Sequence, residues 1–220
     1  FFGLKQARAC LFVALFFASV LLVPRTGLLG IPRYDVLLIL ALLIQYWMVW
    51  SKLETVDELK AICLFHLVGF ALEVFKTSGA IQSWSYPDPA FSKVFGVPLF
   101  AGFMYAAVGS YIIQIWRLME LRVRNHPPYW MAALIASLIY LNFFSHHYIG
   151  DYRWYLAALA IGLYARTTVT FRPFDRDRQM PMLLAFILIG FFILFAFIIC
   201  CCCIIVGPVT RLLALPLPFL

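Results

Sequence analysis

Acid–base side chains gather where two apolar segments of the chain end. The candidate catalytic residues are Glu73, His146, His147 and Asp151. Carboxylates and imidazoles are common general acids and bases in enzymes, and pairing them lowers the cost of burying either one. We therefore expect Glu73 and at least one of the two histidines to line a shared polar pocket, capped by aromatic side chains.

Seven further polar or aromatic residues flank these groups and are candidates for substrate binding. They are His66, Lys76, Trp84, Tyr86, Asn142, Arg153 and Trp154. Helical spacings of four and three residues, through Phe70, place His66 and Glu73 on one stripe of a helix. An interfacial ion pair between Glu73 and Lys76 is the simpler alternative to a ligand-binding or proton-moving role. Asp151 and Arg153 also suit a role as anchors at a helix end.

The histidines and cysteines do not predict a metal site. Adjacent residues on a helix point about 100° apart, so His146 and His147 do not readily ligate one ion. Four consecutive cysteines, at 200–203, radiate around a helix in the same way and do not build a tetrahedral site. The chain has no Gly-rich phosphate loop, Gly-x-Ser-x-Gly or Walker motif, and it does not specify a cofactor.

The composition places these groups in a membrane protein. Of the 220 residues, 65% are hydrophobic and only 12% are charged. The stretches 97–116 and 182–206 contain no charged residue, and each reaches the roughly 20 residues that a helix needs to cross a bilayer. The basic residues behind the net charge of +7 are scattered through short loops, which favours membrane lipids over nucleic acid as partners.

The apolar runs predict an all-α fold, a polytopic bundle of about seven transmembrane helices. The expected spans are 9–23, 34–50, 59–75, 97–116, 129–146, 152–170 and 181–206. The fourth span carries small residues along one surface, which lets another helix approach closely. These residues are Ala101, Gly102, Ala106, Gly109 and Ser110.

Four stretches resemble a known family of bacterial integral membrane proteins, catalogued as domain of unknown function 817. They read "LEVFKTSGAIQSWSYPD", "GVPLFAGFMYAAVGSYI", "NFFSHHYIGDYRW" and "RQMPMLLAFILIGFF". The resemblance covers about residues 10–196 and implies a multi-pass membrane location, with no assigned reaction. Residues 197–220 depart from the family pattern, so we expect a membrane domain over 1–196 and an atypical apolar segment, truncated or frame-shifted, after it.

Three functions fit these features. The first is a membrane-embedded enzyme that acts on a lipid-like or isoprenoid-like substrate through a polar pocket on the extracytoplasmic side. The second is a small proton-coupled transporter in which His66 and Glu73 relay protons. The third is a structural membrane protein whose polar residues only anchor its helices. The sequence leaves the oligomeric state open.

The basic residues predict the orientation. Eleven lysines and arginines fall on the side of the N-terminus and six on the other side, so the positive-inside rule places the N-terminus on the cytoplasmic side of the membrane. The family resemblance implies that this membrane is the bacterial inner membrane. We expect a cysteine introduced in the loop 172–178 of a cysteine-free variant to react with a membrane-impermeant maleimide only after the cells are opened. Labelling of that loop in intact cells would reverse the orientation.

Overall fold

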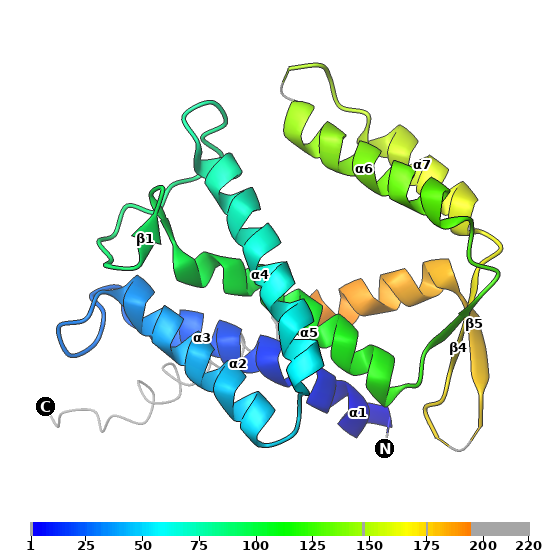
Figure 1. Cartoon of the computed structure of the whole chain (residues 1–220), viewed down its shortest axis with the longest axis horizontal. Helices are drawn as coiled ribbons and strands as arrows, with labels where there is room; N and C mark the ends of the chain where they lie inside the picture. Colours follow the sequence, from blue (N-terminus) through cyan, green and yellow to red (C-terminus); the bar gives the residue numbers. More distant parts are fainter. Residues whose placement is uncertain (1, 147, 175, 195–220) are drawn as a thin grey trace, which may run out of the picture. The chain divides into compact units, whose positions relative to one another are not determined.

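The computed structural model describes residues 2–146, 148–174 and 176–194, which form two compact units. The N-terminal unit contains Gln6–Gln114, and the C-terminal unit contains Ile115–Phe191 with the first five residues. The chain is mostly helical (Figure 1). The elements up to the end of α5 are α1 (Phe2–Ala9), α2 (Leu11–Leu22), α3 (Arg33–Trp50), α4 (Val56–Thr77), β1 (Lys93–Val94), β2 (Val97–Pro98), the 3₁₀ turn η1 (Leu99–Ala101) and α5 (Gly102–Leu118).

Local signals fix the start of α4. Thr55 and Glu58 form a capping box: the Thr55 hydroxyl accepts the backbone N–H of Glu58 at 3.2 Å, and the Glu58 carboxylate accepts the N–H of Thr55 at 2.7 Å. The helix then runs for 22 residues to Thr77, with Lys76 in its last turn. A cation there opposes the negative end of the helix dipole. This length carries Glu73 to the far end of the helix from Thr55.

Helix α4 crosses α5 in close contact (Figure 1), and glycines make that contact possible. A Cβ added at Gly69 would lie 2.4 Å from the Tyr105 side chain, and one at Gly102 would lie 2.7 Å from the backbone oxygen of His66. A Cβ at Gly109 would meet the Phe65 ring at 2.6 Å. Real side chains do not fit at such distances, so the small-residue surface expected on this span is a helix–helix contact.

Aromatic rings fill the rest of this core. Phe12 and Phe16 of α2 are buried and stack near Phe103 of α5, with ring centroids 6.5 and 6.4 Å from it. The hydroxyl of the buried Tyr111 donates to the side chain of Gln6 at 3.1 Å. Helix α5 therefore packs against α1, α2 and α4.

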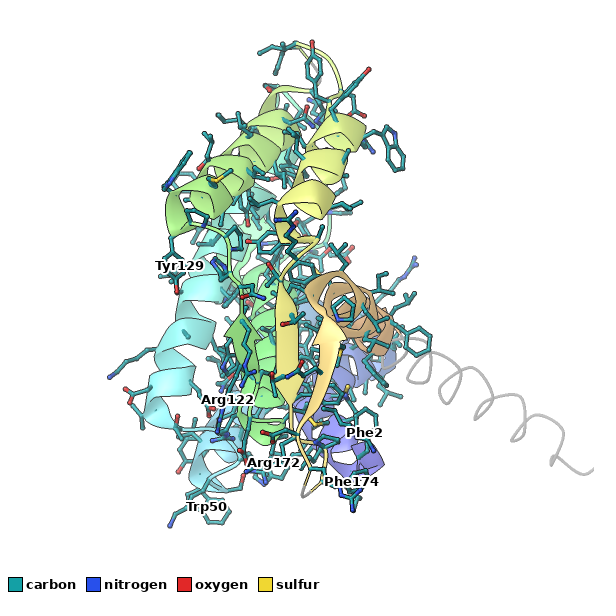
Figure 2. The ribbon with its side chains drawn as sticks, turned by 90° about the vertical axis from the view of Figure 1, so that its right-hand side faces the viewer. Phe2, Trp50, Arg122, Tyr129, Arg172 and Phe174 are labelled. Carbon is teal, nitrogen blue, oxygen red and sulfur yellow. The ribbon has the colours of Figure 1, made fainter. Side chains whose placement is uncertain are left out.

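The C-terminal unit combines a small sheet with apolar helices. Its elements are β3 (Arg122–Arg124), α6 (Tyr129–Ser145), α7 (Arg153–Tyr164), β4 (Thr168–Phe171), β5 (Arg178–Pro181) and the helix Met182–Leu194. The three strands pair antiparallel in the order β3-β4-β5. Arg172, labelled with Arg122 in Figure 2, follows β4 and bonds Glu120 at 3.2 Å and Asp177 at 2.9 Å. These ion pairs tie the ends of the strands together.

Two parts of the expected fold are wrong. The chain is not all-α, because residues expected in the sixth span form β4, where Thr168, Val169 and Thr170 favour a strand through their branched Cβ atoms. Seven spans are also not supported: among the described residues, α3 and the segment Leu99–Leu118 are long and apolar enough, and the bent pair α1 and α2 is a third candidate.

The remaining expected spans are less well supported, each for its own reason. Helix α7 has 12 residues, about 18 Å of helix, which is short against a hydrocarbon core of ~30 Å. Helix α6 is apolar, but with 17 residues it is at the lower limit of spanning length, and α4 carries charged residues at both ends. The seventh expected span extends to 206, so its later part lies outside the described residues, as does the segment 197–220.

We expect the α4–α5 contact to be sensitive to a single methyl group. Gly102→Ala forces a Cβ against the His66 backbone, and overpacking of this kind costs ~1–3 kcal/mol. Gly162→Ala on α7 is the matched control, since a Cβ there meets nothing within 4 Å and alanine favours a helix by up to ~1 kcal/mol. Thermal unfolding in detergent should show a lower Tm for the first variant only; equal Tm values would contradict the close contact.

Candidate functional site

A long connection between α4 and α5 folds back over the end of α4 and is held at three points. The Asp35 carboxylate, near the start of α3, accepts the backbone N–H groups of Phe91 and Ser92, both at 2.8 Å. Lys93 donates to the backbone oxygens of Tyr86 and Asp88 at 2.6 and 2.7 Å. The third point is the carboxylate of Glu73.

The Glu73 carboxylate is buried, with 1% of the residue exposed, and it is saturated with donors. One oxygen accepts the indole N–H of Trp84 at 2.9 Å and the hydroxyl of Tyr86 at 2.8 Å. The other oxygen accepts the hydroxyl of Tyr105 at 2.6 Å. Such donors replace the water that the carboxylate loses on burial.

Lys76 balances the charge of Glu73. Its ammonium lies 3.6 Å from the carboxylate and donates to the Tyr105 hydroxyl at 2.6 Å. It also lies over the Trp84 ring, 4.8 Å from the centroid, where the electron-rich face attracts a cation. Lys76, Tyr105 and Glu73 thus form a hydrogen-bonded chain from ammonium through phenol to carboxylate.

A pocket of about 500 Å³ opens beside this cluster. It is lined by Glu73, Lys76, Trp84, Tyr86, Met104, Tyr105 and Val108. Met104 and Val108 supply apolar wall from α5, while the Lys76–Glu73 cluster supplies the polar end. The pocket therefore matches a molecule with one polar and one apolar part.

Burial raises the pKa of Tyr86 above its ordinary value, and the hydrogen bond to Glu73 raises it further. The phenol therefore keeps its proton well above neutral pH and remains a donor to the carboxylate.

Four of the residues singled out in the sequence come together here: Glu73, Lys76, Trp84 and Tyr86. His66 lies on the same face of α4, as its spacing predicts, but it contacts Gly102 and Phe103 and does not line the pocket. Its Nδ1 atom is buried and has no hydrogen-bond partner among the residues that the structure describes.

The other candidates belong to the turn between α6 and α7 in the C-terminal unit. Asn142 accepts the backbone N–H of Tyr152 at 2.9 Å, and His146 caps α6 with Nδ1 2.9 Å from the backbone oxygen of Phe143. Asp151 forms an ion pair with Arg153. Here the backbone N–H of Arg153, followed by its charge, lowers the pKa of Asp151, as befits the anchor role.

Trp154, in the same turn, is largely exposed, and His147 lies outside the described residues. The donors to Glu73 named above all come from the N-terminal unit, so its shared pocket with a histidine stays a prediction. The described part of the chain contains no group of three or more His, Cys, Asp or Glu side chains placed to hold a metal.

Sequence reasoning missed Tyr105, which stands at the centre of the cluster. A signal for it exists in the pattern: Tyr105 lies three residues after Gly102 and four before Gly109, so it shares their face of α5. A hydroxyl on the one helix face that packs closely against α4 must find a polar partner there, and Glu73 is that partner.

Comparisons with known proteins identify a family and a relative of the chain. The family described as "Protein of unknown function (DUF817)" matches residues 1–205, which extends the expected resemblance at both ends. The uncharacterized protein YoaT of Bacillus subtilis (strain 168) is 50% identical over 192 residues, which are 87% of this chain and 72% of that protein. No solved structure matches the chain.

We expect the Tyr105 hydroxyl to contribute measurably to stability. Tyr105→Phe leaves one oxygen of a buried carboxylate with one donor fewer, which costs ~1–3 kcal/mol. Tyr46→Phe on α3 is the control, because Tyr46 is 70% exposed and such changes stay within about 0.5 kcal/mol. Denaturant unfolding in detergent measures both; an equal effect would mean that the Tyr105–Glu73 bond does not hold the site together.

Proposed function

The chain belongs to the DUF817 family of proteins of unknown function, and we propose that it is a multi-pass membrane protein that binds an amphiphilic, lipid-like molecule beside Glu73. The observation that carries this proposal is the pocket itself, where a partly buried Lys76–Tyr105–Glu73 chain meets the apolar wall of α5. The candidate spans α3 and α5 are consistent with a membrane location.

The basic residues support the orientation of this proposal. This orientation requires α4 to cross the membrane as well, although charged residues lie at both of its ends. With the N-terminus on the cytoplasmic side of a bacterial inner membrane, the connection between α4 and α5 then lies on the extracytoplasmic side. Trp84 and Tyr86 then occupy the depth at which aromatic residues favour the membrane interface. A lipid-like molecule would place its polar group at Lys76 and its chain along Met104 and Val108.

The chemistry of the cluster favours catalysis on that molecule. Lys76, Tyr105 and Glu73 offer an acid, a proton carrier and a base in one hydrogen-bonded chain, so the polar group of the ligand exchanges a proton at Lys76 or Tyr105.

A second candidate, proton-coupled transport, rests on His66. This residue faces α5 as Glu73 does, and its buried Nδ1 lacks a partner in the described part of the chain. Proton flux into proteoliposomes that disappears in His66→Ala would decide for transport. Flux that is absent from the unmodified protein leaves the amphiphile-binding function as the one to pursue.

Filling the pocket should remove the ligand. We expect Val108→Trp to occupy the space beside Tyr105 and to abolish co-purification of a lipid-like molecule, measured by native mass spectrometry and by extraction of the purified protein. Leu42→Trp is the control, because Leu42 is 52% exposed on α3 and outside the pocket. Equal ligand content in the three proteins, at equal folded yield, would contradict the proposal.

A further inference from the structure

A second carboxylate is buried in the N-terminal unit, away from the pocket. Glu54 lies between α3 and α4 and is 2% exposed, and its backbone N–H donates to the Met48 oxygen at 2.9 Å. Its carboxylate accepts hydrogen bonds from the Gln45 amide of α3 and from the Ser110 hydroxyl of α5. Both partners are buried and lie within the two candidate spans.

Glu54 forms no ion pair with any residue that the structure describes: no lysine, arginine or histidine nitrogen among them lies within ion-pair distance of its carboxylate. Two neutral donors are a weak substitute for water around a full negative charge, and a buried carboxylate of this kind is costly unless a cation accompanies it. Glu73 differs in this respect, because the Lys76 ammonium lies 3.6 Å from its carboxylate.

A second observation concerns the side-chain oxygen of Gln45. The Oε1 atom of Gln45 is buried and has no hydrogen-bond partner in the described part of the chain, although Gln45 itself is only 6% exposed. Oxygen and nitrogen of an amide are equivalent in shape. In the structure the Nε2 group of Gln45, not Oε1, lies at the Glu54 carboxylate. A cation would have to replace that hydrogen bond, and a half-turn of the amide would then direct Oε1 at the ion.

We propose that Glu54, Gln45 and Ser110 form a binding site for a monovalent hard cation, of which sodium is the type. All donors are oxygens of carboxylate, amide and hydroxyl, which hard cations prefer over nitrogen or sulfur. A single carboxylate balances one positive charge. The C-terminal end of α3 adds partial negative charge close by, because Gln45 lies in the second turn from Trp50.

This site is independent of the pocket beside Glu73. None of its three residues lines that pocket, so either proposal can fail without the other. A cation held between α3 and α5 stabilises the folded unit in proportion to its occupancy, because the unfolded chain does not hold the three groups together. The ion is therefore detectable through stability without knowledge of any activity.

The test uses the purified full chain in detergent at constant ionic strength. We expect replacement of choline chloride by sodium chloride to raise the Tm by roughly 5 °C at saturation, and Glu54→Gln to abolish this rise. Glu120→Gln is the matched control: its carboxylate is about half exposed in the C-terminal unit, and the sodium-dependent rise should persist in it.

A second variant covers the case in which Glu54→Gln does not fold. Ser110→Ala keeps the carboxylate and removes one ligand, so the sodium concentration at half-saturation should increase at least threefold. The proposal is overturned if the Tm is the same in sodium and choline, if the rise survives in Glu54→Gln, or if Tm follows pH alone, which would mean that a proton occupies the site.

Discussion

The fold of the N-terminal unit is organised around a carboxylate that has left water. Glu73 is near the end of α4, and once buried it needs replacements for each hydrogen bond that water made. Those replacements come from three places in the chain: the loop residues Trp84 and Tyr86, Tyr105 of α5 and Lys76 of α4 itself. Satisfying one side chain therefore fixes the loop over the helix pair.

The same requirement explains why α4 and α5 approach so closely. The Tyr105 hydroxyl reaches Glu73 only because Gly69 leaves room for the Tyr105 ring against α4. Packing and polar satisfaction are thus one constraint: a larger residue at Gly69 displaces the ring, and a displaced ring leaves the carboxylate short of a donor. Asp35 extends this frame, because its bonds to Phe91 and Ser92 tie the far end of the loop to α3.

The sequence predicted what depends on local pattern and missed what depends on helix length and pairing. Each expected apolar run contains a helix. The ion pair of Glu73 with Lys76 was one of the alternatives that the sequence offered, whereas the pocket shared by Glu73 and a histidine stays a prediction. Apolar composition cannot distinguish a span from a short helix followed by a strand, as at Thr168–Phe171. Glu54 was missed because its stretch "KLETVDELK" has the composition of a charged, solvated turn. Its burial depends on packing against α5, which is distant in the sequence.

Glu73 and Glu54, which are both buried, differ in the way their charge is compensated, and this difference separates their proposed roles. Glu73 has an ammonium fixed by the chain itself, so its charge is balanced whether or not anything binds, and the site can work as a permanent polar end for an amphiphile. Glu54 has only neutral donors among the described residues. Under the proposal above, an exchangeable cation balances its charge, so this site responds to the ionic conditions around the membrane. A fixed pair suits binding and catalysis, whereas an uncompensated carboxylate suits exchange.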